Sequence, residues 1–72
     1  MIKYLHKKIK FKDKNNFEYL GFVSNYESKV DSENGICGEL YVDIETSNNP
    51  ERKKRQGWIF LENEIKEIKI VD

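Results

Sequence analysis

The chain has 72 residues, which fits one domain over residues 1–72 and leaves no room for a deep catalytic cleft. Charged residues make up 36% of the chain, but the 12% of aromatic residues argue against disorder. The 13 basic and 13 acidic side chains cancel, so no net field draws the protein toward nucleic acid. We expect a folded binding module rather than an enzyme.

The first predicted hairpin has its strands at residues 5–12 and 17–30. In the first strand, Ile9 and Phe11 alternate with lysines, which is the period of a half-buried strand. In the second, Gly21 lies in mid-strand, and a glycine in that position usually marks a sharp bend or a barrel corner. This stretch predicts an antiparallel β protein.

The remaining chain predicts three more strands. The pair Asn34-Gly35 is a strong signal for a second hairpin turn, and residues 36–45 then alternate apolar and polar positions. A polar loop at residues 46–57 precedes a fourth strand at residues 58–61 and, after a short turn, a fifth at residues 65–71. Five short strands without a helix of normal length predict an all-β fold, a small five-stranded antiparallel barrel of the SH3-like or Sm-like kind.

Alternation within these strands also predicts the core. The fourth strand, residues 58–61, is apolar on both parities and therefore leaves apolar surface to cover. A homo-oligomer would cover this surface, so the sequence is compatible with a homo-oligomer as well as with a monomer. The predicted core consists of Ile9, Phe11, Val23, Leu40, Val42, Ile44, Ile59, Ile68 and Ile70.

The pattern resembles the Sm-like (Hfq-like) family of small β-barrels. The family's first motif joins an apolar-x-apolar pair, a Lys-Asp-Gly turn and an aromatic-x-Gly-x-apolar element. Here IKF at residues 9–11, KNN at residues 14–16 and YLGFV at residues 19–23 take these places, and Tyr26-Glu27 takes the aromatic-Asp step that follows. Residues 60–68 are similar to the last two strands of the family. The resemblance implies a barrel that pairs with copies of itself.

The chain departs from the Sm-like pattern at the positions where the family binds RNA. Asn16 replaces the turn glycine, Glu27 replaces the motif's Asp, and Lys29 replaces the Asn that follows it. Where the family has a Lys-His pair before its last strand, this chain has Glu62-Asn63. The resemblance therefore implies a barrel without the usual uridine-binding site of the ring pore.

No pattern in the sequence predicts a catalytic or metal site. His6 and Cys37 are the only residues of their kinds, too few for a metal site with a recognised spacing. A nucleophilic Cys37 needs a base, and none is predicted beside it. The acids Glu39, Asp43 and Glu45 share one strand face, which is more typical of a solvated face than of acid–base chemistry. We expect no cofactor and no bound metal.

The basic run at residues 52–55 is the sharpest functional candidate. Four adjacent cations repel one another, but in a loop they could neutralise phosphates and release counterions. Trp58 could stack on bases, although a solubilising loop with Trp58 in the core fits the same residues. The predicted nucleic-acid interface consists of Lys7, Lys8, Lys10, Arg52, Lys53, Lys54, Arg55 and Trp58.

Two kinds of function stay open. Residues 1–14 and 52–72 are net basic, and one continuous patch of the two would favour binding of single-stranded nucleic acid. Residues 15–51 are net acidic and would favour a protein partner with basic segments. In that alternative, the chain is a protein-interaction module, such as a small regulatory or accessory protein of a phage or mobile element.

The compartment is predicted from the cysteine count and the hydropathy. Because Cys37 has no second cysteine to pair with in the chain, we expect a reducing compartment. No apolar run approaches the roughly 18 residues of a membrane-spanning helix, and residues 1–10 lack the hydrophobic segment of a secretory signal. We therefore expect a cytoplasmic protein without a membrane segment.

Overall fold

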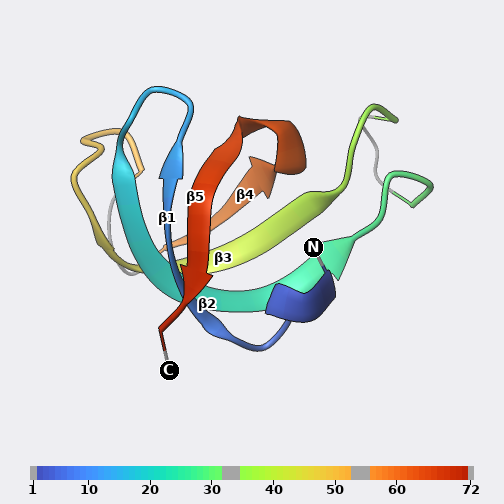
Figure 1. Ribbon diagram of the computed structural model, residues 1–72, viewed down its shortest axis with the longest axis horizontal. Coiled ribbons are helices and arrows are strands. Elements are labelled where there is room, and N and C mark those ends of the chain that lie inside the picture. The colour runs from blue at the N-terminus through green and yellow to red at the C-terminus, as the bar shows by residue number, and fades with distance from the viewer. Residues whose placement is uncertain (1, 32–34, 53–55, 72) are drawn as a thin grey trace.

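A computed structural model describes residues 2–31, 35–52 and 56–71 (Figure 1). All five strands belong to one antiparallel sheet with the order β4-β3-β2-β1-β5, so the protein is all-β, as predicted. Short 3₁₀ turns precede β1 and join β4 to β5. The elements are η1 (Ile2–Tyr4), β1 (Lys8–Asp13), β2 (Glu18–Glu27), β3 (Glu39–Ser47), β4 (Gly57–Leu61), η2 (Glu62–Glu64) and β5 (Ile65–Ile70).

Two strands begin three residues later than predicted, and the second strand, β2, ends at Glu27 rather than at residue 30. The first strand begins at Lys8 because η1 and a turn at His6, with a φ of 61°, occupy the residues before it. The third begins at Glu39, and Ile36, predicted as its first residue, is 68% exposed. The predicted turn residue Asn34 lies outside the described part of the chain.

The central strand β2 curves strongly across the sheet, as Figure 1 shows. Its pairing with β3 shifts between Leu20 and Gly21 and again between Val23 and Asn25. Gly21 is required by space: a Cβ there would lie 2.5 Å from the carbonyl oxygen of Asp43 and 2.8 Å from Cγ1 of Val42. The bend expected at this glycine therefore follows from close contact between β2 and β3.

Three aromatic rings form the centre of the core. The centroid of Phe60 lies 4.9 Å from those of both Phe11 and Tyr19, with edge-on geometry, and Phe11 and Tyr19 stack at 5.0 Å. Such pairs stabilise a core beyond the effect of area burial alone. The buried apolar residues are Tyr4, Ile9, Phe11, Tyr19, Val23, Leu40, Val42, Ile44 and Phe60.

The core prediction is wrong at two isoleucines. Ile59 is 46% exposed because Trp58 and Phe60, its neighbours on β4, face the core instead. Ile70 is 44% exposed because it is the last residue of β5, which among the described strands pairs with β1 alone. Ile68 packs partly buried against the core. The homo-oligomer expected from the apolar surface of β4 stays a prediction.

No helix among the described residues has the length and apolar character needed to cross a membrane.

Candidate functional site

The outer face of β1 and β5 carries five lysines, which we call the lysine face: Lys8, Lys10, Lys12, Lys66 and Lys69. On β1, Ile9, Phe11 and Asp13 are buried. Since successive side chains of a strand point to opposite faces, the three lysines between and before them point outward.

A bulge in β5 brings the other two lysines to the same face. Lys69 pairs with Lys10, and Lys66 pairs with Lys12, although Lys66 and Lys69 lie three positions apart. Strict alternation would place them on opposite faces of the sheet. The register shift between these pairs adds one residue to β5 at Glu67, whose φ is 53°. The bulge therefore places two pairs of like charges directly opposite one another.

Such pairs oppose folding, because like charges directly opposite in a sheet are destabilising. Lys12 is partly compensated by Glu67 at 3.6 Å, and Lys8 contacts Glu45 at 2.9 Å. Within the described ranges of the chain, Lys10, Lys66 and Lys69 make no ion pair. The lysine face thus holds unneutralised positive charge at the centre of two strands.

Two adjoining hollows on this surface together extend over β5, β1, β2 and β3, and we call them together the transverse groove. One has a volume of about 390 Å³ and the other about 280 Å³, and both are lined by Lys10 and Glu18. The larger lies over β2 and β3, and the smaller over β5 and β1. The larger is also lined by Leu20, Thr46, Ser47 and Asn48; the smaller also by Lys12, Glu67 and Lys69.

The register explains why these residues meet. Lys10 pairs with Leu20 on β2, and Leu20 pairs with Thr46 on β3. With Lys69 on β5 they form one row across four strands, on the face opposite the core. A cationic end, an apolar middle and a hydroxyl end are therefore aligned along a single line.

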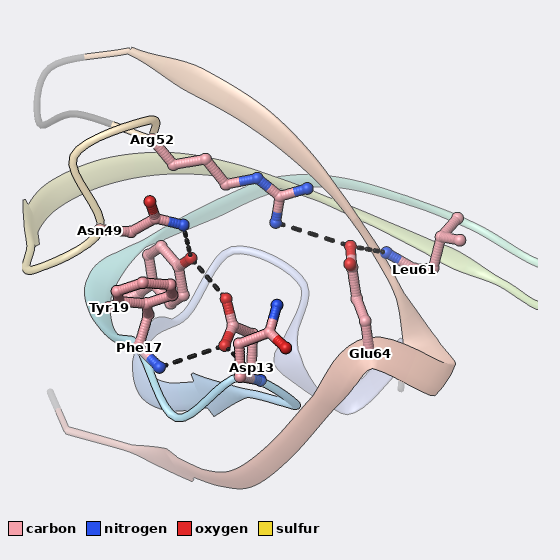
Figure 2. Close-up of polar contacts among 8 residues, drawn as sticks. Asp13, Phe17, Tyr19, Asn49, Arg52, Leu61 and Glu64 are labelled. Atoms are coloured by element: carbon pink, nitrogen blue, oxygen red, sulfur yellow. Dashed lines mark hydrogen bonds and ion pairs between the residues drawn. The ribbon is translucent and has the colours of Figure 1, made fainter.

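Arg52 occupies a different environment from the lysines. Its guanidinium carbon lies 4.3 Å from the ring centroid of Phe60 and 6.0 Å from that of Trp58. Its Nη1 lies 3.6 Å from Oε1 of Glu64, and Figure 2 shows the side chain reaching across toward this carboxylate. The Arg52 side chain is only 25% exposed. Arg52 therefore covers one end of the core on the inner side of the sheet.

A polar network lies beside Arg52. The Tyr19 hydroxyl donates to Oδ2 of Asp13 at 2.6 Å and accepts from Nδ2 of Asn49 at 2.8 Å (Figure 2). Asp13 Oδ1 accepts from the backbone N–H groups of Asn15 and Phe17 at 2.9 and 3.1 Å. Burial, followed by the hydrogen bond to Asp13, raises the pKa of Tyr19 above its ordinary value. The network fastens the β1–β2 turn to the β3–β4 loop.

The structure divides the predicted interface. Lys7 is exposed just before β1, and Lys8 and Lys10 lie on the lysine face. Arg52 and Trp58 lie together, but on the inner side of the sheet, where Trp58 packs partly buried against the core. The predicted Lys53, Lys54 and Arg55 lie outside the described residues.

Three lysines of the lysine face were not predicted as site residues: Lys12, Lys66 and Lys69. Lys12 continues the alternation of Lys8 and Lys10, so that pattern could have identified it. No sequence signal identifies the pairing of β5 with β1 or the bulge at Glu67, which bring Lys66 and Lys69 beside them.

The described residues contain no group of three or more His, Cys, Asp or Glu side chains that could hold a metal ion. In comparisons with protein-family models, curated proteins and solved structures, the chain matches none. The lysine face and the transverse groove are therefore interpreted from their own geometry.

Proposed function

We propose that the protein is a small non-catalytic module that binds single-stranded nucleic acid on its lysine face. The observation that carries this proposal is the direct pairing of Lys10 with Lys69 and of Lys12 with Lys66. These pairs cost folding free energy in the isolated protein, whereas phosphates laid along them would neutralise the charge and release counterions.

Protection of a sheet edge does not explain the whole lysine face. Lysines on an edge strand discourage pairing with other chains, and this account suits Lys66 and Lys69 on β5. However, β1 is an interior strand, paired with β2 on one side and β5 on the other. Lys10 and Lys12 on β1 therefore need a different reason, and an anionic ligand supplies one.

A single strand suits this face because an exposed aromatic ring lies beside the charges. Phe22 is 44% exposed on the outer side of β2, and its Cα partner on β1 is Lys8. The ring of His6 stacks on the ring of Phe22, with 6.3 Å between the ring centroids and an interplanar angle of 10°. Unpaired bases stack on such rings with little regard to sequence, whereas the bases of a duplex are already stacked on each other.

We also propose that the sheet closes into an SH3-like or Sm-like barrel. Its two edge strands, β4 and β5, are joined only by η2. The Lys14 N–H donates a hydrogen bond to the Glu64 carbonyl of η2 at 2.9 Å. At the other end of η2, the Glu62 N–H donates to the Gly38 carbonyl at 2.9 Å. These bonds link η2 to the residue that follows β1 and to the residue that precedes β3, which supports closure.

The proposal is tested by fluorescence anisotropy with a labelled single strand over a series of salt concentrations. Lys10→Ser combined with Lys69→Ser removes two phosphate contacts, so the slope of log K against log salt should fall by about 1.4. The control is Lys29→Ser, which removes an exposed lysine beyond the end of β2 and should leave the slope unchanged. Absence of binding by the wild-type protein at low salt, or equal slopes in both variants, would reject this function.

A further inference from the structure

We infer that the transverse groove holds one base of the bound strand and that the Glu18 carboxylate selects guanine there. This inference rests on the proposed function and extends it from the phosphates to one base. The observation behind it is the carboxylate of Glu18, which would repel the ligand if this surface bound phosphates only. Glu18 lines both hollows of the groove and stands between the lysines of β1 and the polar end of β3.

Glu18 is not explained as an ion-pair partner. Its Cα partner is Lys12, yet the Lys12 ammonium pairs with Glu67 instead. Throughout the described part of the chain, no lysine or arginine lies within ion-pair distance of the Glu18 carboxylate. A free carboxylate in this position repels phosphates, so its presence favours a ligand group that donates hydrogen bonds.

The backbone around Glu18 holds the opposite wall of the groove in place. The Glu18 N–H donates to Oδ1 of Asn48 at 2.8 Å, and the Asn48 N–H donates to the Glu18 carbonyl at 3.3 Å. Because Oδ1 of Asn48 is used in this way, its amide Nδ2 is the donor left for a ligand. Among the described residues, neither this Nδ2 nor the Thr46 hydroxyl has a hydrogen-bond partner.

The size and the lining of the larger hollow suit a single base. Between Thr46 and Ile44 the pairing of β3 with β2 skips Glu45, and this bulge lies directly beside Leu20. Leu20 is partly buried and offers an apolar surface for one face of a base. The volume of about 390 Å³ is within the range of ~300–1,000 Å³ that is typical of small-ligand pockets.

The donors and acceptors of this site match guanine. Guanine carries a carbonyl acceptor, O6, and an amino donor, N2, on edges that an unpaired base exposes. The Asn48 amide and the Thr46 hydroxyl can donate to O6, while the Glu18 carboxylate accepts from N1 and N2, which are adjacent donors. Thymine and uracil present carbonyl oxygens on both sides of their single N–H, which a carboxylate repels, and adenine has no carbonyl to accept from Asn48. Cytosine has a carbonyl and an amino group, but between them lies the acceptor N3, which the carboxylate also repels.

The test uses oligothymidine strands that differ only in one central base: guanine, adenine, cytosine or thymine. The guanine strand should bind at least about fivefold more tightly than the others, the lower end of what a two-point base contact contributes. Glu18→Gln should abolish this preference while leaving the affinity for the all-thymine strand equal or higher, since a repulsive charge is removed.

Asp43→Asn is the matched control. It removes the same charge from an exposed acid on the outer face of β3, but Asp43 lines neither hollow of the groove, so the guanine preference should persist. Thr46→Val is an independent second variant, which removes a hydroxyl from the groove at almost constant shape and should reduce the preference. Equal binding of all four strands by the wild type, or a preference that survives Glu18→Gln, would overturn guanine selection and leave the proposed function intact. Failure of the wild type to bind any of the four strands would overturn both.

Discussion

Two cationic regions of this molecule use their charge in opposite ways. At one end of the core, on the inner side of the sheet, Arg52 lies over Phe60 and contacts Glu64, so its charge is neutralised within the fold. On the outer face, Lys10 and Lys69 lie directly opposite each other, and neither makes an ion pair with any residue that the structure describes. The density of charge along the sequence is therefore a poor guide to a binding surface. What distinguishes the two regions is whether the protein itself satisfies the charge.

The largest expected effect on stability comes from a substitution of Arg52. Arg52→Ala should lower the free energy of unfolding by about 0.5–2 kcal/mol, because it removes a cation from the faces of two aromatic rings. Its affinity for a single strand should change little. Urea denaturation and anisotropy measure the two quantities, and a variant of unchanged stability with much weaker binding would reverse the roles assigned to the two regions.

A substitution on the lysine face should change the free energy of unfolding in the opposite direction. Lys69→Glu replaces a like-charge pair with an ion pair opposite Lys10, which should raise the free energy of unfolding by about 0.2–1 kcal/mol. The same change places a negative charge where a phosphate is proposed to bind, so affinity for a single strand should fall sharply. A loss of stability in Lys69→Glu would show that the unpaired lysines are not repelling each other.

The smallest expected effect concerns alkaline pH and the polar network beside Arg52. Because burial raises the pKa of Tyr19 in the folded protein above 10.0, its contribution to stability is complete below pH 10 and is lost as the pH rises above that value. Tyr19→Phe should therefore show a shallower loss of stability above pH 10 than the wild type. Parallel pH profiles of the two proteins in urea denaturation would contradict this role of Tyr19.

Alternation along the sequence predicts the parts of the fold in which each strand has one buried face. Leu40, Val42 and Ile44 on β3 are buried as expected, since a period of two identifies their face directly. The apolar residues of β4 fall on both parities, so alternation could not decide that Phe60 rather than Ile59 enters the core.

The candidate site was predictable only in part, for a different physical reason. The lysines of β1 stand out in the sequence, but their neighbours on β5 are brought there by long-range pairing and by a bulge at Glu67. The packing of Arg52 over Phe60 likewise depends on contacts between segments distant in sequence. A run of basic residues predicts where cations occur, and tertiary contacts decide which of them remain available to a ligand.

The central claim is that a single strand binds on the outer lysine face and not at the Arg52 end. The most direct measurement is a ¹⁵N–¹H correlation NMR titration of the wild-type protein with a short single strand. The account predicts shifts of the backbone amides of Lys10, Leu20, Thr46 and Lys69, with the indole signal of Trp58 nearly unmoved. Shifts of the Trp58 indole and the Arg52 amide, with the lysine face unchanged, would contradict it.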